Sequence, residues 1–311
     1  MSSPKRNLKK PVLLLSPNAF KLPANASRKR YLRSLKNGTE IYDLLKAKGC
    51  DVRLLGATSS SCSRLRSKYV DDFEKRRPRS VLRIEGNRPI DECMISWPRD
   101  GFQIYGDLVF SSIGFEKTTI EVLSKLGRSP IKIETSELGI GGMVVGTGKL
   151  LVFSESIKKA DASRRKGLGI LRQHGYTIRF MPPSVEYYRA IDRTRGPSEH
   201  IDLSFNLAAT KEGNLLACAY SEYYKYFHEQ VDKLVKEIDA KLHVIPEDEG
   251  MIAANLIGLP DGKVVLPEGC HSTQAFFERH LGSSNVFTIK VDALVSNWQE
   301  GGFRCMSNLV Q

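Results

Sequence analysis

Residues 101–134, GFQIYGDLVFSSIGFEKTTIEVLSKLGRSPIKIE, predict one complete structural unit. The first twelve residues place apolar side chains on both sides of the turn Gly106–Asp107, which is typical of a β-hairpin. Residues 116–127 have the apolar spacing of an amphipathic helix and end at a glycine. The β-branched segment PIKIE then predicts a short strand. The stretch as a whole therefore predicts a ββαβ unit.

The same order of hairpin, helix and strand recurs three more times along the chain. The signals are again apolar runs around glycine, aspartate and asparagine turns. The hairpins are predicted at 141–155, 201–220 and 251–269, the helices at 157–174, 221–240 and 271–281, and the strands at 176–182, 241–246 and 285–291.

A fifth unit is split between the two ends of the chain. Its helix is predicted at 39–48 and its strand at 51–56, but no hairpin precedes them. Apolar segments remain at 11–17 and 303–310, and their pairing would supply the hairpin and close a ring. The pattern therefore favours a five-fold pseudosymmetric α/β propeller over an ordinary mixed α/β sheet, which stays as the alternative.

Composition sets limits on this protein. The chain has 311 residues, of which 41% are hydrophobic and 26% charged, as in globular proteins. We expect a basic N-terminal tail at 1–10 and a single domain at 11–311. No apolar run approaches the roughly 20 residues of a membrane helix, and the first apolar stretch is too short for a signal peptide. The six cysteines are scattered without a CxxC pair, so we expect reduced thiols in a cytoplasmic protein without zinc.

The formal net charge is +12, and basic residues gather at 5–10, 28–36 and 64–79. Such a surplus can attract nucleic acid or anionic substrates. No recognised nucleic-acid motif accompanies it. We therefore predict a solvated basic face and no nucleic-acid partner.

Four chemically versatile residues lie where predicted strands begin. Cys305 stands in GGFRCMSN, His200 and Asp202 in HIDLSF, and Asp100 in WPRDGF. A thiolate can attack an electrophilic carbon, and an imidazole can move protons. Two carboxylates suit a guanidinium, which forms bidentate hydrogen bonds. In a strand, positions two apart face the same side, so His200 and Asp202 are predicted to point together. Taken singly, each of the four also fits a structural or surface role.

The segments WPRDGFQIYGD, HIDLSF and GGFRCMSN resemble the guanidino-group-modifying enzymes of the pentein superfamily. These include arginine deiminases, dimethylarginine dimethylaminohydrolases, agmatine deiminases and amidinotransferases. The resemblance extends from about residue 11 to 311 and implies a ring of five ββαβ units. It implies that Cys305 is the nucleophile, that His200 is the general acid and base, and that Asp100 and Asp202 bind the substrate guanidinium. No metal or organic cofactor is implied, and the expected partner is a small guanidino compound.

Three further site residues come from the resemblance, together with one departure from it. Trp97 would stack on the cation, and Phe20 in SPNAFK would border the pocket. The family has an acidic residue where Ile140 stands here, and an aspartate where Met143 stands. Glu137 is the nearest replacement for the missing acid. The resemblance implies a cysteine hydrolase that forms a thiouronium intermediate. An amidinotransferase remains an alternative, as does a catalytically impaired binding protein.

Overall fold

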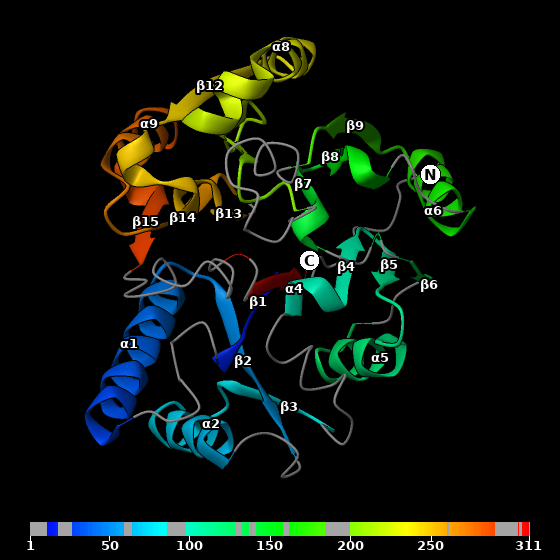
Figure 1. Cartoon of the computed structure of the whole chain (residues 1–311). Coiled ribbons are helices and arrows are strands. Elements are labelled where there is room, and N and C mark those ends of the chain that lie inside the picture. Colours follow the sequence, from blue (N-terminus) through cyan, green and yellow to red (C-terminus); the bar gives the residue numbers. More distant parts are fainter. Residues whose placement is uncertain are drawn as a thin grey trace, which may run out of the picture.

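The computed structural model describes residues 11–17, 27–58, 64–85, 98–128, 132–136, 138, 141–157, 162–183, 200–259, 261–289, 304 and 307–310. The predicted tail at 1–10 lies outside these residues. The described part of the chain forms five small β-sheets, with its long helices on the outside (Figure 1).

The unit that opened the sequence analysis has the predicted order of elements. It consists of strands β4 (Phe102–Tyr105) and β5 (Leu108–Ser111), helix α5 (Glu116–Lys125) and strand β6 (Lys132–Thr135). Strand β5 pairs antiparallel with β4 and parallel with β6. Gly106 has a φ of 63°, which an L side chain rarely adopts, so the hairpin turn requires this glycine.

Three further units repeat this topology, with the same antiparallel and parallel pairings. Their elements are β7 (Val144–Thr147), β8 (Leu150–Ser154), α6 (Ala162–Gln173) and β9 (Thr177–Met181); β10 (Phe205–Ala209), β11 (Leu215–Tyr220), α8 (Ser221–Glu237) and β12 (Ala240–Ile245); and β13 (Ile257–Leu259), β14 (Lys263–Pro267), α9 (His271–Leu281) and β15 (Val286–Ile289).

The fifth sheet joins the two ends of the chain, in the order β16-β1-β2-β3. Strand β1 (Val12–Leu15) pairs antiparallel with β16 (Ser307–Val310) and parallel with β2 (Asp51–Ala57). This confirms the predicted pairing of the terminal strands. It also places Ser307–Val310, which begins three residues after Arg304, in the same sheet as the first described strand.

Two features of this sheet differ from the prediction. Helix α1 (Arg28–Ala47) begins well before residue 39, because the Ser27 side chain caps it by accepting a hydrogen bond from the Arg30 N–H. The second difference is that α2 (Arg64–Arg76) and β3 (Val81–Ile84) form in a region without predicted elements, and β3 adds a fourth strand to the sheet.

Five hydrophobic clusters connect the sheets in a cycle. Each cluster combines side chains from two neighbouring sheets, in the order β1–β3 with β4–β6, then β7–β9, β10–β12 and β13–β15. The cycle closes where Leu13 and Val52 pack in one cluster with Val265 and Phe287. The protein is therefore an α/β propeller of five units, as the repeat predicts.

The first strand of each unit lies closest to the centre of the ring. Strand β10 contacts both β7 and β13, and β16 contacts β4. The segments that enter these inner strands therefore come from distant parts of the sequence and meet near one axis. In the part of the chain described, no helix has the length and apolarity needed to cross a membrane.

Candidate functional site

Polar residues from all five units meet where the chain enters the inner strands. They are Asp100 before β4, Gly142 before β7, His200 and Asp202 before β10, Asn255 before β13, and Arg304 before β16. Asp202, Asn255 and Arg304 are buried, whereas the His200 side chain is 28% exposed. The cluster therefore has a fixed polar base and an imidazole that solvent can reach.

His200 and Asp202 lie close together, but not for the predicted reason. Nδ1 of His200 is 3.9 Å from Oδ1 of Asp202. Residues 201–204 form a turn, and the strand begins only at Phe205, so strand alternation does not align the two side chains. Instead, the Ile201 N–H donates to the Gly142 carbonyl at 2.8 Å and ties this turn to the preceding unit.

Asp100 lies in the short helix α4 (Pro98–Gly101) and completes the group of ionisable side chains. Its Oδ1 accepts a hydrogen bond of 3.4 Å from the Gly142 N–H. Burial raises the pKa of the Asp100 carboxyl above its ordinary value. The charge of His200 opposes this shift, and the Asp202 carboxylate adds to it. A cation between the two carboxylates would relieve both their desolvation and their repulsion.

The glycine pair in LGIGGM allows the close packing of this site. A Cβ atom on Gly142 would overlap the imidazole ring of His200, and one on Gly141 would overlap the Arg99 side chain. The Gly142 backbone also contacts two neighbouring units, through Asp100 on one side and Ile201 on the other. Glycine is therefore required at both positions because neighbouring side chains leave no room for a Cβ atom, and not because the backbone is left-handed.

Gly142→Ala is expected to displace the His200 ring. With His200 in the acid–base role that the resemblance implies, turnover should fall by roughly 10²-fold, because misplacing such a group by about 1 Å has that effect. Overpacking should also reduce the free energy of unfolding by about 1–3 kcal/mol. Kinetics and urea denaturation measure the two effects.

Gly169→Ala is the matched control, since a Cβ at Gly169 in α6 meets nothing within 4 Å. It should leave turnover unchanged and stabilise the helix by roughly 0.5–1 kcal/mol. Equal behaviour of the two variants would exclude contact between Gly142 and the imidazole.

Arg304 is a buried cation that the sequence analysis did not assign to the site. Its Nη1 donates to Oδ2 of Asp202 and to the Gly141 carbonyl, and its Nη2 donates to the Val144 carbonyl at 2.8 Å. Its backbone N–H donates to Oδ1 of Asn255 at 2.8 Å. Asp202 thus already holds one guanidinium, which belongs to the protein itself.

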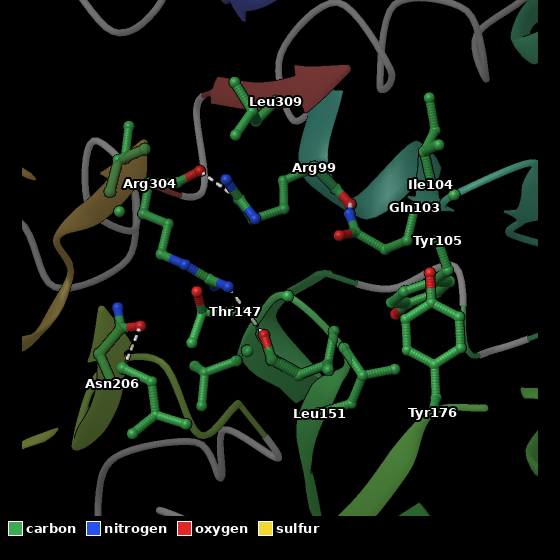
Figure 2. Close-up of a pocket in the computed structure, with 18 residues that line it drawn as sticks. Arg99, Gln103, Ile104, Tyr105, Thr147, Leu151, Tyr176, Asn206, Arg304 and Leu309 are labelled. Carbon is green, nitrogen blue, oxygen red and sulfur yellow. Dashed lines mark hydrogen bonds between the residues drawn. The ribbon is translucent and has the colours of Figure 1, made fainter. Parts of the chain in front are cut away.

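A second buried arginine, Arg99, fixes the backbone around residue 304. Its Nε lies 2.7 Å from the Arg304 carbonyl oxygen and 3.1 Å from that of Ser307. Both arginines line a cavity of about 120 Å³, which also borders Gln103, Thr147 and Asn206. Figure 2 shows these side chains. This cavity follows the inner strands, and one of its lining residues, Arg304, also bonds Asp202 of the ionisable cluster.

The remaining predicted site residues lie outside the described part of the chain. These are Cys305, Trp97, Glu137 and Phe20, and Ile140 is also outside it. Met143, which stands where the family has an aspartate, packs in the core between two sheets. Sequence reasoning missed Gly142, Asn255 and Arg304. The signal that could have found them is their shared position just before an inner strand.

Comparison with known proteins gives matches at the level of structure. No family model matches the sequence, and no curated protein matches it. Dimethylarginine dimethylaminohydrolase from Pseudomonas aeruginosa, in a complex with citrulline, superposes with a TM-score of 0.58 at 16% identity over 97% of this chain and 98% of that one.

Two further solved structures match at similar levels. Agmatine deiminase from C. jejuni gives a TM-score of 0.61 at 14% identity, over 96% of this chain and 92% of that one. The inosamine-phosphate amidinotransferase from Streptomyces griseus gives 0.56 at 12% identity, over 96% and 93%. With its five cyclically packed ββαβ units, the chain has the fold of the guanidino-group-modifying enzymes of the pentein superfamily.

Proposed function

We propose that this protein is a guanidino-group-modifying enzyme with Cys305 as its nucleophile and His200 as its general acid and base. The observation that carries the proposal is the cluster of Asp100, His200 and Asp202, which is bonded to Arg304, the residue next to Cys305. The site thus brings together the acid–base group of His200, the Asp100 carboxylate, which a cation would stabilise, and Arg304, the neighbour of a thiol.

The proposed reaction begins with attack of the Cys305 thiolate on the guanidinium carbon. The C–N bond breaks, and the leaving amine or ammonia takes a proton from His200. A thiouronium remains on the cysteine. His200 then accepts a proton from water as the water attacks the same carbon. The C–S bond breaks with its electron pair on the thiolate, and the hydroxyl proton of the adduct passes to solvent or to the released amine, which leaves a neutral ureido product.

The two aspartates have different tasks in this proposal. Asp100, whose raised pKa reflects its burial, would bind the substrate guanidinium. Asp202 is fully buried and has Oδ2 engaged by Arg304 and by Asn255. We assign Asp202 to holding the His200 imidazole through Oδ1, rather than to the substrate contact that the resemblance implies.

An amidinotransferase is the second candidate, and it differs only in the acceptor. In that reaction an amine would replace water in the second step, so the same cluster serves both. The superposed structures include hydrolases and an amidinotransferase. The alternative of a binding protein rests on Ile140, which removes one carboxylate of the family pattern.

Product analysis separates these candidates. The protein is incubated with arginine, methylated arginines and agmatine, each with and without an amine acceptor, and the products are identified by mass spectrometry. A ureido product indicates a hydrolase, and a new guanidino compound formed only with the acceptor indicates a transferase. Saturable binding without any product would support the binding protein and contradict the proposal.

Asp100→Asn gives a test that needs no substrate. A carboxyl with a raised pKa binds its proton more tightly in the folded state, so stability falls as the pH rises from about 3.9, the unfolded value, through the raised one. Asparagine does not titrate. The stability of Asp100→Asn relative to the unsubstituted protein should therefore increase from acidic to neutral pH, as measured by urea denaturation at several pH values. Parallel curves would show that Asp100 is not desolvated.

A further inference from the structure

The positive charge of the protein is concentrated in its first 85 residues, which include β1, α1, β2, α2 and β3 of one unit. Residues 1–85 contain 21 Lys and Arg but only seven Asp and Glu, whereas residues 86–311 contain 26 and 28. The first acidic residue of the chain is Glu40, and none occurs between residues 52 and 70. The net charge alone favoured a solvated face and no nucleic-acid partner, but its concentration in this part of the chain favours a polyanionic partner there.

The fold brings two basic stretches of this unit onto one surface. Helices α1 and α2 pack side by side outside the sheet β16-β1-β2-β3 (Figure 1). Tyr31 contacts Lys68, Tyr69 and Asp72, while Asp43 near the end of α1 binds Arg77 at the end of α2. The helices therefore run parallel, with both N-terminal halves at the same end.

That end carries eight basic residues, here called the basic face. Seven of them are exposed and Arg66 is partly buried. Lys36 also forms a surface ion pair with Glu40, and Lys68 also lies over the Tyr31 ring. The basic face consists of Arg28, Lys29, Arg30, Arg33, Lys36, Arg64, Arg66 and Lys68.

The composition of the basic face favours a nucleic acid over a lipid membrane as its partner. The apolar side of α1, including Leu35 and Leu45, is buried in the core, and in α1 the large apolar side chain that remains exposed is Leu32. A membrane-surface helix needs an apolar side that enters the lipid. Five of the eight residues are arginines, whose planar guanidinium binds phosphate in a bidentate manner. A nucleic acid offers a regular series of phosphates to such a surface.

We propose that the basic face binds the sugar–phosphate backbone of a nucleic acid, independently of the reaction at the ring axis. The contacts are electrostatic and independent of base sequence, so affinity falls steeply with salt. The face lies on the outer helices of its unit, whereas the ionisable cluster lies near the centre of the ring. Nucleic acid and a small substrate can therefore bind together.

The test measures binding of the full-length protein to fluorescein-labelled DNA duplex and single-stranded RNA by fluorescence anisotropy, between about 50 and 200 mM salt. The variant reverses three exposed charges in the first turn of α1, as Arg28→Glu, Lys29→Glu and Arg30→Glu. Glutamates in this turn favour the helix dipole, so the fold is retained. The variant should bind at least about tenfold more weakly, with a slope of log affinity against log salt reduced by about 3.

A matched control reverses the same number of charges on other units, with Lys117→Glu, Lys211→Glu and Lys233→Glu, all of which are exposed. It should bind nucleic acid with close to the original affinity and slope. Equal loss in both variants would show that net charge alone drives binding and would overturn the proposal. Two other results would also overturn the proposal. One is binding to phosphatidylserine vesicles without binding to either nucleic acid, and the other is salt-dependent self-association without binding to vesicles or nucleic acid.

Discussion

Cys305→Ala is expected to lower turnover of any guanidino substrate by at least about 10⁴-fold, because removal of a covalent nucleophile leaves only binding and proton transfer. The substituted side chain is small, so folding should be retained. The measurement is product formation under saturating substrate, together with thermal unfolding of both proteins. Turnover by Cys305→Ala at even a tenth of the original rate would exclude the covalent route.

Three cysteines that the structure does describe, Cys50, Cys218 and Cys270, provide an internal control. Burial raises the pKa of Cys218 and of Cys270 to about 12, and it raises the pKa of Cys50 as well. Their thiols are therefore almost fully protonated at neutral pH. An amidine electrophile such as 2-chloroacetamidine should alkylate Cys305 first and stop turnover with one equivalent bound. Peptide mass spectrometry identifies the labelled residue, and Cys50→Ala should keep both activity and labelling.

Arg304→Met is expected to cost about 3–5 kcal/mol of unfolding free energy, because it leaves the Asp202 carboxylate buried without its cation. This is a large part of the roughly 5–15 kcal/mol that stabilises a typical domain. The Gly141 and Val144 carbonyls would also lose their donor. Urea denaturation measures the loss.

A double-mutant cycle isolates the pair from the other contacts of Arg304. Asp202→Asn alone leaves the arginine uncompensated, and the combined variant should cost less than the two single changes together by about 1–3 kcal/mol. The exposed pair Lys225–Glu247 provides a comparison, since its side chains are 63% and 59% exposed. Lys225→Met should cost no more than about 1 kcal/mol. Additive costs at Asp202 and Arg304 would show that the buried ion pair contributes no coupling.

The repeated unit could be predicted from sequence because its signals are local. Glycines with positive φ, such as Gly106, Gly213 and Gly262, lie in the turns between the two apolar strands of the hairpins. Helix α2 was missed because its apolar positions, Tyr69, Val70 and Phe73, are surrounded by charge. These three side chains are spaced three and four residues apart, so they lie on one face of a helix. Burying that face against the sheet stabilises the helix although most of its other residues are charged.

The site was less predictable, because its decisive contacts join distant residues. Asp202 and Arg304 are about a hundred positions apart in the chain, and no local pattern indicates that they pair. The motif HIDLSF brought His200 and Asp202 to attention, but their proximity depends on a turn held by the Gly142 carbonyl from another unit. The motifs identified candidate residues, but only the packing of the units showed which of these residues contact one another.

The pairing of β1 with β16 has a consequence for how the protein is made. Among the described elements β16 is translated last, so β1 leaves the ribosome long before its antiparallel partner exists. During synthesis β1 presents an apolar open edge of the kind that promotes aggregation, and closing a loop of almost the whole chain is slow. Arg304 also arrives at this late stage, so Asp202 acquires its counter-charge in the step that closes the ring. In a nascent chain the ionisable cluster therefore stays incomplete until Arg304 and β16 have been synthesised and have packed against the earlier units.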